Sequence, residues 1–232
     1  MRLYSLVEPI DLDCAAVAPV SDTGYVKCEA CGYYIDYPKP SKRTVEWLEG
    51  SDHICSFVWT SRLIGEVLVT EEVRQALQKT GVEFLPVEFY QDPKLKKPKR
   101  VTKRTKPRVW LPYEGPPLYD LWVSTWVHAD LTRSSLRLVQ VCPICGHKAY
   151  EVEGIEERKH RWDATKRELV EIHTPRVEGK GVYVCREDLQ GADIFRLYEI
   201  SGWILCTERV KVIIEGERFT NVSFLEVGEV ME

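Results

Sequence analysis

Two stretches of the 232-residue chain decide the expected fold: GEVLVTEEV at residues 65–73 and GWILCTERV at residues 202–210. Five of their nine positions are identical. A second block follows each stretch, VEFLPV at residues 82–87 and VSFLEV at residues 222–227, and these blocks agree at four of six positions. A duplicated unit explains the matches, and chance similarity between two common patterns is the alternative.

Each copy of this unit has the local pattern of a strand, a short helix and a second strand. The expected first strands are residues 63–69 and 203–206. Thr70 and Thr207 follow them, each with an acidic residue in the next position, which is the pattern of a helix N-cap. Apolar residues then recur at helical spacing, and Gly81 and Gly216 stand where a helix would stop. The sequence therefore predicts an α+β fold with two related strand-helix-strand halves.

A Cys-x-x-Cys-Gly motif precedes each unit, as CEACG at residues 28–32 and as CPICG at residues 142–146. The order of motifs is therefore the same in both halves. Between the halves, residues 92–117 contain six prolines, which is typical of an extended connection. The expected division is an N-terminal half at residues 1–91, a connector at 92–117 and a C-terminal half at 118–232.

Aromatic and branched residues after the connector predict further strands at residues 118–127 and 136–141. The second of these leads directly into the CPICG motif. The charged segment at residues 158–168 is compatible with a helix or a loop, and residue propensity does not decide between the two.

The two motifs supply four candidate metal ligands: Cys28, Cys31, Cys142 and Cys145. Two intervening residues allow both sulfurs of one turn to reach the same ion, and the glycine allows backbone N–H groups to point at the sulfurs. The 110 residues between the two motifs would make the site a zinc ribbon split by a large insertion. We predict a structural Zn²⁺ that joins the halves. The alternatives are unmetallated thiols, disulfides within each turn and a redox motif.

The remaining cysteines and the histidines form no recognisable site. Cys14, Cys55, Cys185 and Cys206 lack ligand spacing, and we expect Cys206 to be a small core residue. His147 follows the second motif, but four cysteines already complete a tetrahedron, so we expect a polar surface histidine. The other histidines are isolated, and no catalytic or phosphate-binding motif is present. We therefore expect a protein that is not an enzyme.

The amino-acid composition excludes several classes of protein. Hydrophobic residues make up 44% and charged residues 29% of the chain, which excludes disorder of the whole chain. No apolar stretch reaches the roughly 18 residues that a membrane span needs, and the first residues lack the apolar region of a signal peptide. We therefore expect a cytoplasmic protein with reduced cysteines and no membrane contact.

A basic run of nine Lys and Arg residues, without an acidic one, lies at residues 94–108, although the net charge is −4. Such a run in a proline-rich connector is usually solvated, but it could contact phosphate groups. An alternative function is therefore a zinc-ribbon protein that binds nucleic acid through this segment. The acidic remainder of the chain disfavours that alternative.

The two cysteine motifs, PPLYDLWV at residues 116–123 and DIFRLYEISGWILCTERV at residues 193–210 together resemble the myxobacterial double-CXXCG motif family. The resemblance covers nearly the whole chain. It implies a cytoplasmic immunity protein that is paired with a swarm-inhibition toxin exchanged between kin cells. The residues that match the family motif one by one are Cys28, Cys31, Gly32, Cys142, Cys145 and Gly146.

The first functional hypothesis is therefore a non-enzymatic immunity protein that binds and masks a cognate toxin. Charged positions in the connector would suit recognition of one particular toxin, because complementary and repulsive charges set specificity among related pairs. The alternatives, from other classes, are the nucleic-acid-binding protein and a thiol oxidoreductase.

Overall fold

The computed structural model describes residues 1–9, 13–20, 26–36, 38–61, 66–98, 100, 102, 105–163, 165 and 167–232. Within these residues about 40% lie in strands and about 9% in helices. The predicted α+β fold of two strand-helix-strand halves was therefore wrong, because the chain is mostly β. Strands also form outside the repeated blocks, as in Arg43–Trp47, where buried and half-buried residues alternate.

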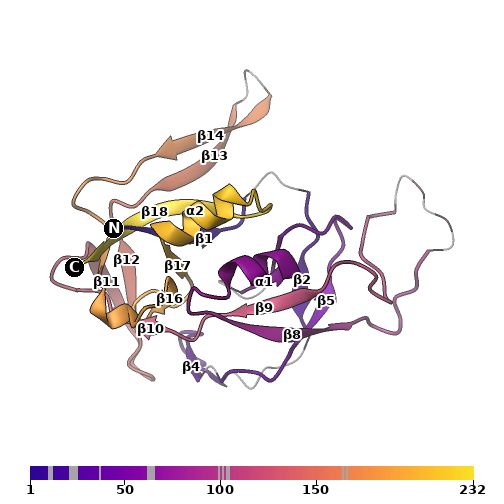
Figure 1. Cartoon of the computed structure of the whole chain (residues 1–232), viewed down its shortest axis with the longest axis horizontal. Coiled ribbons are helices and arrows are strands. Elements are labelled where there is room, and N and C mark those ends of the chain that lie inside the picture. The colour runs from indigo at the N-terminus through magenta and orange to yellow at the C-terminus, as the bar shows by residue number, and fades with distance from the viewer. Residues whose placement is uncertain are drawn as a thin grey trace.

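The described residues form two six-stranded sheets, which make up the body, and three two-stranded hairpins (Figure 1). The first sheet has the order β2 (Val17–Pro19), β5 (Arg43–Trp47), β8 (Glu83–Tyr90), β9 (Leu118–Trp122), β7 (Val67–Thr70), β6 (Phe57–Trp59). The second has the order β10 (Trp126–Val127), β16 (Ile194–Leu197), β17 (Ile204–Thr207), β1 (Arg2–Val7), β18 (Ser223–Met231), β15 (Val182–Cys185). The hairpins are β3 (Val26–Lys27) with β4 (Tyr34–Asp36), β11 (Leu136–Val141) with β12 (Lys148–Val152), and β13 (Glu157–Asp163) with β14 (Glu168–Thr174).

The described helices are short. They are α1 (Glu71–Leu77), α2 (Glu208–Gly216) and the 3₁₀ helix η1 (Glu187–Leu189). Thr70 and Thr207 occupy the N-cap positions of α1 and α2, but neither side chain caps its helix. The predicted N-cap positions were therefore confirmed, without a side-chain capping hydrogen bond. The Thr207 hydroxyl instead donates a hydrogen bond of 2.8 Å to the Asp193 carboxylate, which precedes β16.

The two helices contact each other, and one hydrophobic core is built around them (Figure 1). Val73 and Leu77 of α1 belong to the same buried cluster as Val210 and Ile214 of α2. Side chains from strands of both sheets complete this cluster, among them Leu6 of β1. A further cluster lies on each sheet separately. The central core therefore belongs to both sheets.

The two sheets are built alike. The order β16-β17-β1-β18-β15 of the second sheet corresponds to β6-β7-β9-β8-β5 of the first. In both, the first three neighbouring pairs are antiparallel and the last is parallel. The registers also agree: Leu3 pairs with Thr207 and Tyr4 with Cys206, as Leu118 pairs with Thr70 and Tyr119 with Val69. The duplication therefore includes strands outside the repeated blocks.

The first strand of each half lies in the sheet of the other half. β1 precedes the first cysteine motif but pairs with β17 and β18, and β9 precedes the second motif but pairs with β7 and β8. These strands contain LYSL at residues 3–6 and LYDL at residues 118–121, which begin 25 and 24 positions before the first cysteine of their motif. The two halves therefore exchange equivalent strands. The sheets do not coincide with residues 1–91 and 118–232.

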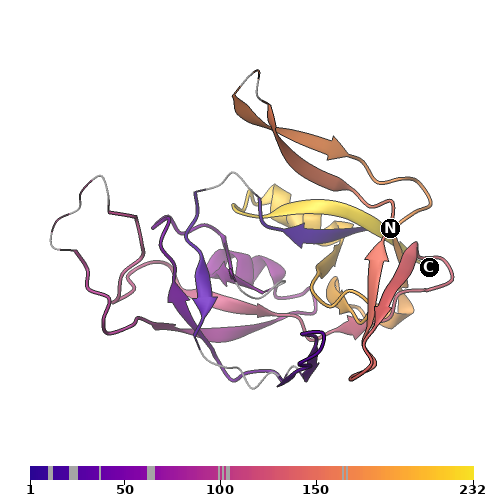
Figure 2. The ribbon, with the colours of Figure 1, turned by 180° about the vertical axis from the view of Figure 1, so that it is seen from behind.

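The segment at residues 158–168, for which a helix or a loop was expected, belongs instead to the hairpin β13-β14. This hairpin projects from the body on the side of β18 (Figures 1 and 2). The described positions among residues 92–117 contain no helix or strand, and they lie at the other end of the molecule (Figure 2). Residues 63–65, part of one predicted strand, lie outside the described residues.

The exchanged strands and the shared core predict that both sheets unfold together. Leu6→Ala removes a buried side chain of the central core and should cost about 2–5 kcal/mol of the free energy of unfolding. Thermal unfolding should still show a single transition, and hydrogen exchange should accelerate in β7 and β8 as well as in β17 and β18. Leu131→Ala, at an exposed position, is the control and should change neither quantity. Two separate transitions, of which Leu6→Ala shifts one, would contradict the shared core.

Candidate metal centre

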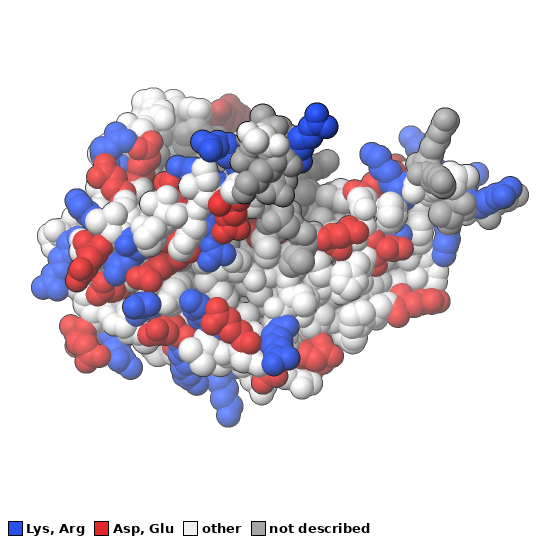
Figure 3. All heavy atoms as spheres, turned by 90° about the horizontal axis from the view of Figure 1, so that it is seen from above, with Lys and Arg blue, Asp and Glu red and all other residues white. Residues whose placement is uncertain are grey.

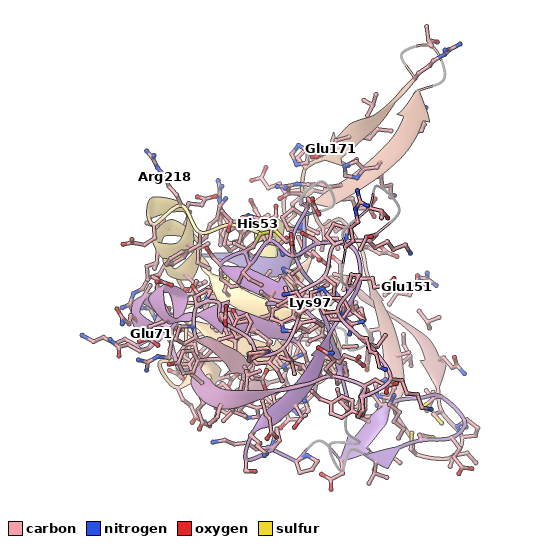
Figure 4. The ribbon with its side chains drawn as sticks, turned by 90° about the vertical axis from the view of Figure 1, so that its right-hand side faces the viewer. His53, Glu71, Lys97, Glu151, Glu171 and Arg218 are labelled. Carbon is pink, nitrogen blue, oxygen red and sulfur yellow. A yellow bond between two sulfur atoms is a disulfide. The ribbon has the colours of Figure 1, made fainter. Side chains whose placement is uncertain are left out.

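The four predicted ligands lie in two turns that face each other. Cys28 and Cys31 lie in the turn between β3 and β4, and Cys142 and Cys145 lie in the turn between β11 and β12. The four sulfur atoms lie within 4.8 Å of one another, so these residues could hold one metal ion. Figure 4 shows sulfur atoms in yellow between the violet hairpin β3-β4 and the salmon hairpin β11-β12.

The sulfur separations fit tetrahedral coordination by thiolates. The Sγ atoms of Cys28 and Cys142 are 3.7 Å apart, and those of Cys31 and Cys145 are 3.6 Å apart. Four sulfur atoms at about 2.3 Å from a central ion form a tetrahedron with edges of about 3.8 Å. All four cysteines are free, which disfavours disulfides within the turns. An ion held here would connect the two halves of the chain.

Both turns have the same backbone geometry, which explains the glycine that ends each motif. Gly32 and Gly146 have φ angles of 71° and 72°, in the left-handed region that favours glycine. Their N–H groups donate hydrogen bonds to the carbonyl oxygens of Cys28, at 2.8 Å, and of Cys142, at 3.0 Å. Each turn is therefore closed by its own backbone.

The thiols differ in how readily they lose a proton. Backbone N–H groups of Cys145 and of the residue before it lower the pKa of Cys142 to about 6. A backbone hydrogen bond from Tyr33 favours the Cys31 thiolate, but burial and the neighbouring thiols raise the pKa of Cys31 to about 12. A backbone hydrogen bond from His147 likewise favours the Cys145 thiolate, but burial and nearby thiols raise the pKa of Cys145. A metal must therefore displace protons from at least two thiols at neutral pH.

His147 lies beside the four cysteines and packs on the opposite turn. Its imidazole stacks on the Tyr33 ring, with ring centroids 3.6 Å apart and planes inclined by 10°. Tyr33 follows the first motif and His147 follows the second, so the stacked pair adds a contact between the halves. Burial lowers the pKa of His147, which keeps the ring neutral at neutral pH. His147 is half-buried, so the expected polar surface histidine also packs between the two turns.

The other four cysteines lie away from this cluster. Cys206 is buried in the central core, as predicted, and burial raises its pKa well above the usual value. Cys185 is an exposed thiol. Cys14 and Cys55 form a disulfide, so the expectation of reduced cysteines was wrong for this pair. A separation of 41 residues in the sequence does not indicate that these two cysteines pair. The disulfide forms because the segments before β2 and β6 lie side by side.

A cavity of about 650 Å³ opens beside the four cysteines, and Cys31 and Cys142 are part of its lining. Five aromatic rings contribute to it: Tyr33, Tyr34, Trp126, His147 and Tyr198. Arg196 of β16 and Glu66, which precedes β7, supply charged groups. No motif pointed to this cavity, because its residues come from elements far apart in the sequence.

Buried charges lie behind the cavity. Arg43 of β5 forms ion pairs with Asp120 of β9 at 2.9 Å and with Glu66 at 3.3 Å, and all three side chains are almost fully buried. Burial raises the pKa of Asp120 to about 6, against the attraction of the Arg43 guanidinium. The one signal in the sequence is an acidic residue inside the apolar strand LYDLWV.

Acidic side chains already pair with part of the basic run at residues 94–108. Arg108 forms an ion pair with Glu46 at 2.8 Å, and Lys106 lies 3.8 Å from Glu49. Figure 3 shows Lys and Arg interspersed with Asp and Glu over the face in view. Three of the nine cations, Lys99, Lys103 and Arg104, lie outside the described residues. Two of the six described cations of the run are therefore paired with acidic side chains.

None of the described helices has the length and apolar character needed to cross a membrane. A comparison of the sequence with protein families found no family that matches, and a comparison with curated proteins found no match.

The unequal pKa values predict how metal affinity depends on pH. Cys31 and Cys145 are protonated at neutral pH, so binding of Zn²⁺, used as the probe ion, should release at least two protons. The logarithm of the association constant should then rise by at least two per pH unit near neutral pH, as measured by competition with a chromophoric chelator.

The same titration gives the stoichiometry. The protein should bind about one ion, Cys142→Ser should bind far more weakly, and Cys185→Ser, a variant of an exposed cysteine outside the cluster, should behave as the unaltered protein. An affinity that does not change with pH, or one that Cys142→Ser leaves intact, would show that these thiols are not the ligands.

Proposed function

We propose that this protein is a non-enzymatic immunity protein of the cytoplasm, in which a structural Zn²⁺ stabilises a surface that binds and masks a cognate toxin. The observation that carries the proposal is the meeting of the two Cys-x-x-Cys-Gly turns, because the resemblance to the double-CXXCG family rests on these same residues. The geometry supports the metal, and the resemblance supports the partner.

Zinc is the ion that best fits the donor set. Four thiolates at tetrahedral separation select a soft or borderline ion, such as Zn²⁺ or iron. Two turns of the Cys-x-x-Cys type, each carried by its own hairpin, are the usual ligands of structural zinc. When bound, the ion would hold the hairpin β3-β4 against the hairpin β11-β12.

A binding role suits this site better than catalysis. Four protein ligands fill the coordination sphere of a tetrahedral ion, so the ion would have no position at which to activate water or substrate. Three other histidines interact with carboxylates: His128 with Glu199, His160 with Glu171 and His173 with Glu156. A fixed, metal-clamped surface is what recognition of one partner requires, since a preorganised surface loses less entropy on binding.

The proposal predicts a toxic partner encoded next to this gene. Expression of the neighbouring gene in a laboratory bacterium should arrest growth, and co-expression of this protein should restore it. The two purified proteins should form a complex with nanomolar or tighter affinity, because free toxin would harm the producer.

The variant that tests the role of the metal is the double substitution Cys28→Ser, Cys142→Ser, which removes one cysteine from each turn. It should lose both the metal and protection from the toxin, as seen in growth assays and in calorimetric titrations. If the neighbouring product is harmless, or if growth stays arrested on co-expression of soluble, metal-loaded protein, the immunity proposal is wrong.

A further inference from the structure

The cavity beside the metal centre has the build of a binding pocket. Its volume of about 650 Å³ lies within the range of about 300–1,000 Å³ that is usual for ligand sites. It opens at the junction of the two halves, and both cysteine turns contribute to its wall. Bound metal would therefore fix one side of the pocket before anything enters it.

Flat rings and one guanidinium form the interior. The Arg196 guanidinium lies over the Trp126 ring, 5.8 Å from its centroid, and donates a hydrogen bond of 3.0 Å to the Ser201 carbonyl oxygen. Only 5% of the surface of Arg196 is exposed. The Tyr198 ring lies against Trp126, with centroids 5.5 Å apart. These contacts hold the groups in place, so the pocket offers fixed aromatic faces beside a positive group.

The charges in and behind the pocket give no net positive field. Arg43 and Arg196 are balanced by the buried Glu66 and Asp120. The four thiolates with a divalent ion would add negative charge next to the pocket. A ligand that carries phosphate or another strong anion is therefore disfavoured, and an uncharged aromatic ring fits the pocket best.

Exposed apolar side chains lie on the two hairpins that carry the metal turns, and one of them, Ile35, also lines the pocket. Six large hydrophobic residues of the two hairpins are exposed: Val26, Ile35, Leu138, Val139, Val141 and Ile144. Ile144, between the two cysteines of the second turn, is 74% exposed. Exposed apolar side chains beside a pocket mark a protein interface, since a small ligand inside the pocket would leave these side chains in water.

We infer that a protein partner docks on the hairpins β3-β4 and β11-β12 and inserts an aromatic side chain into this pocket. The inference rests on the proposed function, whose toxin would be the partner. Aromatic side chains that fill a pocket ringed by apolar contacts are the usual centres of binding energy in protein interfaces. The metal centre would thereby set the shape of the recognition surface.

The pocket is tested first without any toxin. N-acetyltryptophanamide, an uncharged mimic of a Trp side chain, should cause saturable NMR shifts at Gly202 and Tyr198, both of which line the pocket. Ala149→Trp, which fills the pocket from β12, should abolish the shifts while one metal ion stays bound. Adenosine and adenosine monophosphate test the nucleobase alternative and should not saturate.

A second pair of variants guards against loss of folding in Ala149→Trp. Tyr198→Ala removes one aromatic wall of the pocket at a position that is 46% exposed. It should weaken the binding of N-acetyltryptophanamide at least about fivefold. Tyr90→Ala, at a position of β8 that is 41% exposed, should leave it unchanged. Absence of saturable amide binding, equal binding by the two variants, or tighter binding of either adenosine compound would overturn the inference.

The toxin then tests the surface. Ala149→Trp and Ile144→Ser should each weaken toxin binding about tenfold or more, whereas Val212→Ser, at an exposed position of α2, should not. Unchanged toxin affinity in both hairpin variants would overturn this docking surface and leave the proposed function intact. If the neighbouring product does not bind at all, the proposed function fails, and the amide titration still decides whether the pocket takes an aromatic side chain.

Discussion

The exchange of β1 and β9 between the sheets is the constraint on which the rest of the structure depends. Each exchanged strand is the central partner of the helix-linked strands in the opposite half, and each leads toward a cysteine motif. Matching contacts connect the halves elsewhere: the Ile194 N–H donates to the Thr80 carbonyl oxygen at 3.1 Å, and the Phe57 N–H donates to that of Thr220 at 3.2 Å. The two cysteine turns meet because the two halves are interlocked in this way.

Function is expected where the two related halves differ. Asp120 of β9 occupies the position that Ser5 occupies in β1, and both are buried. Of these two residues, only Asp120 has a buried arginine partner, Arg43. Burying these charged groups costs free energy, whereas hydrophobic residues at the same positions would not carry this cost. The pocket lies on the side of this charged group, next to the metal turns. The duplicated scaffold thus carries a cavity and a buried charged group that make its two halves unequal.

The sequence predicted the local parts of the fold and of the site. The strand before Thr207, both helices and the four cysteines followed from short-range patterns, namely apolar runs, a Thr-Glu pair and two-residue spacing. The fold class was wrong because strand exchange and hairpin packing depend on residues far apart in the chain. The Cys14–Cys55 disulfide and the pocket were missed for the same reason, since neither Arg196 nor Trp126 has a sequence signal that relates it to the cysteines.

Cleavage of the connector tests the strand exchange most directly. A protease site placed between residues 98 and 106 would cut the chain outside every described strand, leaving β1 in one fragment and β9 in the other. If each fragment supplies a central strand to the other's sheet, the two fragments should stay together as one folded species in native mass spectrometry, even after a chelator removes the metal. Two separately folded fragments, held together by the metal alone or not at all, would contradict the exchange.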